Sequence, residues 1–130
     1  MITSDEIITD LYRYISASEL MDEVSGVLCR KVRDKDSTLE DVVISVKSNV
    51  NGQKQIAKAN VHVYVGGIYH DRQINCAKRS QDLQKICARI FDSFRTGSAK
   101  CELLTQSEIK LDGTDEYLIN NEIKYTIINE

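Results

Sequence analysis

The residues best placed to do chemistry lie around the segment VHVYVGG, which runs from Val61 to Gly67. His62 and His70 flank a glycine pair ahead of a predicted helix, an arrangement that suggests a phosphate site. A phosphate loop needs a helix directly behind its glycines, whereas residues 68–71 intervene here. The chain also lacks G-K-[ST] and the G-x-G-x-x-G spacing. We therefore interpret the segment as a strand that leaves a sheet.

The polar stretch at residues 33–41 suggests calcium binding at first sight. Asp34 and Asp36 have the spacing that begins an EF-hand loop. The sixth position of such a loop needs glycine and the twelfth a bidentate carboxylate, but these positions hold Leu39 and Ser45. The stretch is therefore interpreted as a solvated loop.

The cysteines do not form a metal or redox motif either. None of the four is part of a C-x-x-C pair, so neither a zinc ribbon nor a thioredoxin-type site fits. They are expected to be reduced, buried structural thiols. The four positions are Cys29, Cys76, Cys87 and Cys101.

Catalytic groups are not recognisable elsewhere in the sequence. It contains no H-E-x-x-H, nucleophile elbow or paired-histidine metal site, and its carboxylates are scattered. We therefore expect no catalytic residues, no cofactor and no metal ligands, and conclude that the chain is not an enzyme.

Composition bounds the remaining classes. The 130 residues predict a single domain over 1–130, and the net charge of −3 gives no overall attraction to nucleic acid. No apolar run approaches the ~18 residues of a bilayer-spanning helix, so no membrane association is expected. The first residues lack the basic and apolar regions of a secretory signal, which predicts residence in a cytoplasm.

The N-terminal part predicts a capped helix. Thr3 and Glu6 have the spacing of a capping box, and an apolar stripe follows at helical spacing. A short helix is expected at residues 19–24 and a strand at residues 27–32. The stripe comprises Ile7, Ile8, Leu11, Tyr14 and Ile15.

A β-hairpin is predicted next, with strands at residues 42–50 and 53–65. Asn51-Gly52 between them is the dipeptide that favours a two-residue type I′ turn. This turn puts the apolar residues of both strands on one face and His62 on the other. The implied pairs are Val50 with Gln53, Val46 with Ala57, Ile44 with Ala59 and Val42 with Val61.

The last third predicts a long helix and a second hairpin. The helix is expected at residues 71–94, with Asp71 as its N-cap and Gly97 as its stop. Its outer face carries a basic row, interpreted as a solvated surface with charge pairing, or alternatively as a ridge for phosphates. The row comprises Lys78, Lys85 and Arg89, with Asp82 beside them. Strands at residues 100–111 and 116–129 flank an Asp112-Gly113 turn.

The element order predicts an α+β fold. Strands that pair through hairpins form a mostly antiparallel sheet, and two one-sided amphipathic helices cover one of its faces.

These segments resemble a known family. The capped first helix, VSGVLCRKV, EDVVISV, QIAKANVHVYV, the long helix ending in IFDSF, and the hairpin from LDGTDEY to EIKYTII are similar to the tail terminator proteins of long-tailed bacteriophages and prophages. This family is also described as tail-completion or head–tail joining proteins. Its members often have a proline ahead of the second strand, and this chain has none.

The resemblance implies a structural role. Such a protein forms a homo-oligomeric ring, commonly of six subunits, that caps the tail tube protein, stops tail polymerisation and presents a surface to the head connector. DNA would only pass through the ring, and the protein would reside in the virion tail after assembly in the host cytoplasm. Another head–tail neck component of the same fold, or a bacterial domain that binds a protein or small molecule, is the alternative.

Polar excursions on a rigid scaffold are the natural contact points of such a subunit. The expected partner or oligomer interface residues are Asp34, Asp36, Asn51, Gly52, His62, Tyr69 and His70.

Overall fold

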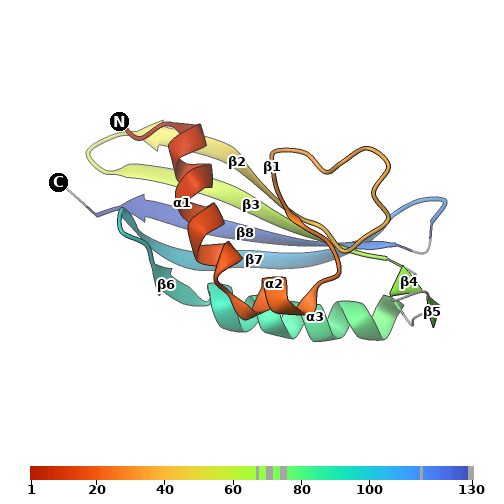
Figure 1. Ribbon diagram of the computed structural model, residues 1–130. Coiled ribbons are helices and arrows are strands. Elements are labelled where there is room, and N and C mark those ends of the chain that lie inside the picture. Colours follow the sequence, from red (N-terminus) through yellow and green to blue (C-terminus); the bar gives the residue numbers. More distant parts are fainter. Residues whose placement is uncertain (67, 70–71, 74–75, 115, 129–130) are drawn as a thin grey trace.

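The computed structural model describes residues 1–66, 68–69, 72–73, 76–114 and 116–128, with side chains not described at 68–69 and 72–73. A six-stranded sheet has the order β1-β2-β3-β8-β7-β6, and β4-β5 form a separate two-stranded ladder (Figure 1). The helices are α1 (Ser4–Ser16), α2 (Glu19–Glu23) and α3 (Cys76–Phe91). The strands are β1 (Leu28–Arg30), β2 (Val42–Asn51), β3 (Gln55–Val65), β4 (Ile68–Tyr69), β5 (Arg72–Gln73), β6 (Ser93–Arg95), β7 (Ala99–Lys110) and β8 (Tyr117–Ile127).

The sheet is mixed, because β1 runs parallel to β2 while every other neighbouring pair in the six-stranded sheet is antiparallel. Helices α1 and α3 pack on the same face of it (Figure 1). The opposite side of the sheet is called the open face below. The predicted α+β class, with two helices on one face, is confirmed.

Local sequence signals explain α1. Thr3 Oγ1 accepts from the Glu6 backbone N–H at 3.2 Å, and the Glu6 carboxylate accepts from the Thr3 N–H at 3.0 Å, so the predicted capping box is present. The apolar stripe faces the sheet, with Ile7, Leu11 and Ile15 fully buried. The helix therefore forms where the backbone N–H groups of its first turn have hydrogen-bond acceptors and where its apolar stripe packs on the sheet.

The long helix is shorter than predicted. It spans Cys76–Phe91, and the predicted N-cap Asp71 lies outside the described residues. Phe94 belongs to β6 instead, where it pairs with Cys101 and stays only 8% exposed. Phe91 and Phe94 are three positions apart, a spacing that fits one face of a helix, so the sequence predicts a helix through Phe94. In the structure the chain after Phe91 instead forms backbone hydrogen bonds with β7. Gly97 follows β6 and does not stop the helix.

The register of the first hairpin differs from the prediction by two residues. Val46 pairs with Ala59 and Ile44 with Val61, so the predicted faces survive because the shift is even. The strands end at the Asn51–Gln55 pair, which leaves a three-residue connection rather than the two-residue turn.

A β-bulge at Lys47 also changes the end of β2. The register shifts between Val46 and Ser48, and the extra residue exchanges the two faces beyond it. Val50, predicted on the apolar face, is therefore 62% exposed. Asn49 takes the inner position and donates to the Ile2 carbonyl at 3.0 Å, while Gln55 donates to the Asn49 side chain at 2.7 Å. Tertiary bonds to the N-terminal residues thus replace apolar packing here.

The second hairpin, β7–β8, forms as predicted around Asp112-Gly113. Gly113 has φ +73°, in the left-handed region that glycine adopts without a Cβ penalty. Alternate residues of β8 from Ile119 to Tyr125 are buried, with Asn121 included among them.

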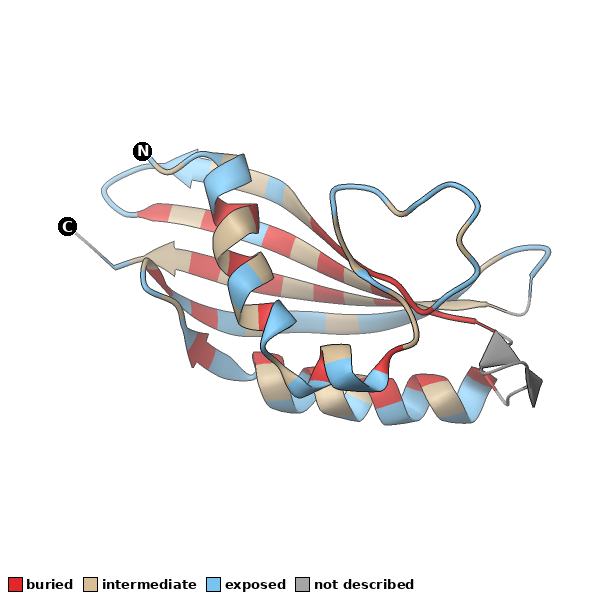
Figure 2. Cartoon of the chain, in the orientation of Figure 1, coloured by how far each residue is buried: buried red, intermediate tan, exposed pale blue. Residues whose placement is uncertain are grey.

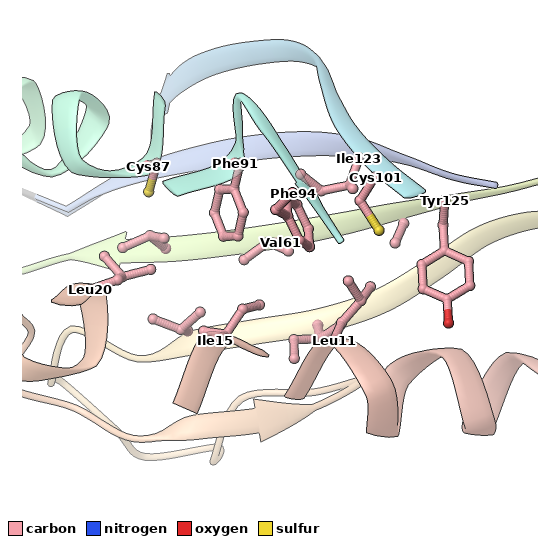
Figure 3. Packing of buried hydrophobic residues seen from close by; sticks show 14 of the residues in the cluster. Leu11, Ile15, Leu20, Val61, Cys87, Phe91, Phe94, Cys101, Ile123 and Tyr125 are labelled. Atoms are coloured by element: carbon pink, nitrogen blue, oxygen red, sulfur yellow. The ribbon is translucent and has the colours of Figure 1, made fainter. Parts of the chain in front are cut away.

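The core fills the space between the helices and the sheet. Figure 2 shows buried residues alternating along the strands and lining the inner sides of the helices. The rings of Phe91 on α3 and Phe94 on β6 point into the core between the sheet and α1 (Figure 3). The Tyr14 ring of α1 stacks on Phe94 with centroids 4.0 Å apart. Three of the four cysteines are buried in the way the sequence predicts, whereas Cys29 on β1 is partly exposed. This core fixes the two ends and the open face of the sheet relative to one another.

Candidate interaction surfaces

Two adjacent acidic residues, Glu40 and Asp41, form the most tightly held polar site. Both are buried, with exposed fractions of 0% and 1%. They precede β2 and point to different partners. The sequence places both residues at the end of a predicted solvated loop, so this site was not predicted. The one signal for it in the sequence is that the two carboxylates directly precede a strand rich in valine.

Glu40 binds Arg79 of α3. The guanidinium Nε and Nη2 donate to the two carboxylate oxygens at 3.0 and 2.9 Å, a bidentate pair. Arg79 also donates to the Glu23 carboxylate at 3.1 Å and to the Glu23 carbonyl at 2.7 Å. Hydrogen bonding to Glu40 raises the pKa of Arg79. One arginine therefore fastens α2, α3 and the start of β2 together.

Asp41 holds the loop at residues 31–41. Its carboxylate accepts from Arg33 Nε at 2.9 Å, from Ser37 Oγ at 2.5 Å and from the Val27 N–H at 3.0 Å. Burial alone would raise the pKa of Asp41, but these hydrogen bonds lower it below its usual value. The loop is thus anchored from inside while its outer residues remain exposed.

Arg33 ties this loop to the β7–β8 hairpin. Its Nη2 donates to Glu116 at 3.1 Å, and its guanidinium carbon lies 4.2 Å from the centroid of the Tyr64 ring. A Cβ on Gly66 would lie 3.0 Å from the Thr38 carbonyl oxygen, so β3 ends against the same loop. We call the assembly of residues 31–41, Gly66, residues 111–114 and Glu116 the loop end of the molecule.

The predicted interface residues do not form one site. Asp34 and Asp36 are exposed at the loop end, whereas Asn51 and Gly52 lie at the tip of the β2–β3 hairpin, at the opposite end of the sheet (Figure 1). His62 lies on the open face between them. The Tyr69 side chain and His70 lie outside the described residues.

The open face is polar and carries two unsatisfied acceptors. His62 pairs with Asn120 across β3 and β8, as predicted for the side away from the valines. Burial lowers the pKa of His62, and a hydrogen bond with Asn120 opposes this. The side-chain oxygens of Asn60 and Asn120 are buried without a hydrogen-bond partner among the described residues.

Two lysines of the open face pair with carboxylates. Lys47 Nζ lies 2.9 Å from the Glu122 carboxylate, and Lys124 Nζ lies 4.0 Å from that of Glu102. Lys58 and Lys100, which the strand register places on the same face, are exposed. The outer side of α3 also carries such a pair, since Arg89 binds Glu19 at 2.7 Å. This pairing favours a solvated surface over a basic ridge for phosphates.

Exposed apolar side chains occur at both ends of the sheet. Val27, Val32 and Leu39 are exposed near the loop end, and Met1, Val50 and Ile128 at the β2–β3 tip. A groove of about 430 Å³ at the tip is lined by residues 1–2, residues 127–128 and the hairpin connection. Exposed apolar residues rimmed by polar ones are typical of protein contact sites.

The described residues contain no group of three or more His, Cys, Asp and Glu side chains that would hold a metal ion. Within the same residues, no helix is long and apolar enough to cross a bilayer. Fold and surfaces together define an α+β protein with two distinct ends and a polar open face.

Comparison with known proteins identifies a structural neighbour but no sequence relative. No family model matches the chain, and no curated protein does. A chain of the solved structure titled "Virion of native gene transfer agent (GTA) particle" is similar in structure, with a TM-score of 0.54 and 6% sequence identity. The match covers 93% of each chain. The two proteins thus share a fold over nearly their whole length.

Proposed function

We propose that this chain is a structural component of a phage-like virion and acts as its tail terminator. It assembles into a ring, caps the tail tube protein, ends tail polymerisation and offers a surface to the head connector. The similarity in fold to a chain of a virion particle, over 93% of both chains, carries this proposal. The resemblance of the sequence segments to tail terminators supports its finer part.

The surfaces suit a ring subunit. A closed ring is built from heterologous contacts, in which one patch of a subunit meets a different patch of the next. The two ends of the sheet carry different residues, and both include exposed apolar side chains. Each end is therefore suited to contact a different partner protein. The tail tube and the head connector would then bind opposite sides of the ring.

The acidity of the chain suits a ring through which DNA must pass. A basic protein would hold phosphates electrostatically. The net charge of this chain is −3, and Lys47 and Lys124 on the open face are paired with carboxylates, whereas Lys58 and Lys100 on that face are exposed. The chain as a whole therefore offers no strong attraction to the duplex.

Tube assembly in the presence of the chain tests the proposal. Purified tail tube protein is polymerised with and without it, and tube lengths and ends are examined by negative-stain electron microscopy, with particle mass from light scattering. We expect shorter tubes with a ring at one end. A chain that stays monomeric and inert toward tubes refutes the terminator role, and a chain that forms rings without capping tubes instead indicates another neck component.

Variants at the two ends sharpen this test. Val32→Glu at the loop end and Val50→Glu at the hairpin tip change side chains that are 74% and 62% exposed, so both variants should fold normally. One should lose tube capping and the other connector binding. Lys85→Glu on the exposed side of α3 serves as the matched control and should retain both activities.

A further inference from the structure

The outer edge of β7 is uncovered over most of its length. The edge strand β6 pairs only with residues 100–102 of β7. Within the described part of the chain, the backbone of residues 104–110 pairs only with β8 and its hairpin. All of these residues except Gln106 are exposed. A long free edge of this kind is a template for pairing with another strand.

The free hydrogen-bonding groups of this edge can be assigned. The Leu111 N–H donates to the Glu116 carbonyl at 2.9 Å and so points toward β8. Because alternate residues of a strand direct their backbone groups to opposite sides, Gln106, Glu108 and Lys110 point theirs away from β8. Three consecutive pairs of N–H and C=O groups are therefore available to a partner.

A second free edge lies on the other side of the same sheet. The three-residue strand β1 pairs only with Val42–Ile44 of β2. In the described chain, residues 45–51 of β2 pair only with β3. The two free segments are seven residues each.

We propose that the free edge of β7 in one copy pairs antiparallel with the free edge of β2 in a second copy, so that the sheet continues from subunit to subunit. This pairing specifies how the subunits of the proposed ring contact one another. That the pairing closes into a ring rests on the proposed function. The directions of β2, β3, β8 and β7 alternate along the sheet. A second copy in the same orientation as the first therefore places its β2 antiparallel to β7 of the first copy.

The offset of the two edges fits a closed barrel. The middle of the β2 segment, Ser48, is level with Lys58 of β3, whereas the middle of the β7 segment, Ser107, is level with His62. Aligning the two middles displaces the second copy by four residues, about 13 Å along the strands. Over four strands, about 19 Å wide, this displacement tilts the strands by roughly 35°, within the range of barrels.

The faces also match after this displacement. Ser48 shares its face with Lys58, and Ser107 shares its face with Asn120 and His62, so both serines lie on the open face. The polar face of one copy therefore continues into the polar face of the next. The alternative is a two-fold dimer in which the β7 edges of two copies pair with each other. This arrangement would bring the two copies of α3 together, because α3 runs alongside this border of the sheet (Figure 1).

Cysteine cross-linking tests the proposed register. Ser48→Cys and Ser107→Cys are made separately in a Cys29→Ser background, which removes the partly exposed native thiol. Mild oxidation of the mixture, with tail tube protein present, should give a disulfide-linked dimer of one variant with the other. Dimers of Ser107→Cys alone, or no dimer in the mixture, overturn the proposal.

A proline variant tests the hydrogen bonds themselves. Glu108→Pro removes an N–H that points outward, so no backbone hydrogen bond within the chain is lost, and the fold should persist by circular dichroism. Glu108→Ala removes the same side-chain contacts to Ser80 and Gln84 but keeps the N–H. We expect loss of assembly in the proline variant only. Equal assembly of both variants overturns the pairing.

The two proposals fail in different ways. If the wild-type chain caps tubes but neither test detects β2–β7 contact, the edge pairing is wrong and the terminator role stands. If the cross-link forms but tubes are not capped, the pairing stands and the terminator role is wrong.

Discussion

Replacing Arg79 by methionine should destabilise the protein strongly. The change removes both bonds to the Glu40 carboxylate, whose side chain is 1% exposed, and leaves it the Ser25 N–H at 3.3 Å. Removing one partner of a buried ion pair costs about 3–5 kcal/mol, because the remaining charge stays desolvated. For a chain of this size the melting temperature should fall by roughly 10–20 °C.

Urea unfolding followed by far-ultraviolet circular dichroism measures this effect. Arg89→Met on the same helix is the matched control, since the Arg89–Glu19 pair is largely exposed and its loss should not change the unfolding midpoint measurably. The double variant Glu40→Leu/Arg79→Met removes both charges and should recover most of the lost stability. A stability of Arg79→Met equal to that of Arg89→Met would refute the reasoning, as would a double variant less stable than Arg79→Met.

Three further predictions concern other parts of the fold. Gly26→Ala should destabilise the fold in urea, because its Cβ would lie 2.4 Å from the Asp41 carboxylate and 2.5 Å from the Glu40 carbonyl carbon, whereas Gly97→Ala, with open space around it, should be neutral. Burial raises the pKa of Cys101 to about 12, so a thiol reagent at neutral pH should modify Cys29 in the folded protein and Cys101 only after unfolding. Burial lowers the pKa of His62 in the folded state, so stability should decline as the pH falls below 6.5, and His62→Gln should lose that decline in a urea series; an unchanged slope would contradict the assignment.

Local patterns in the sequence were enough to predict most elements. The capping box of α1 and the Asp112-Gly113 turn depend on residues within one turn of the chain, so neighbours alone define them. The sorting of β3 into an inner valine face and an outer face with His62 follows from the two-residue period of a strand. The α+β class followed from these faces.

The exposure of the interface candidates could be predicted from the sequence, but their arrangement on the fold could not. Asp34, Asp36, Asn51 and Gly52 are exposed at loop and hairpin tips, as their polar, turn-forming types indicate. These residues lie at opposite ends of one sheet because of how the strands pair. Strand pairing joins distant segments, so it cannot be predicted from neighbouring residues alone. The free edges of β2 and β7 were not predictable, because they exist only where β1 and β6 stop.

What the sequence by itself determined is therefore the type and orientation of most elements, because these are set by periodicity and by capping over a few residues. What only the tertiary structure decided are the bulge at Lys47, the conversion of Phe94 from helix to strand, and the burial of Glu40 against Arg79. Phe94 gains its strand bonds from β7, whereas the other two rest on segments far apart in the chain: Asn49, beyond the bulge, bonds to Ile2, which lies 47 positions away, and Glu40 and Arg79 are 39 positions apart. Their energies outweigh local preference only after the core has brought the segments together.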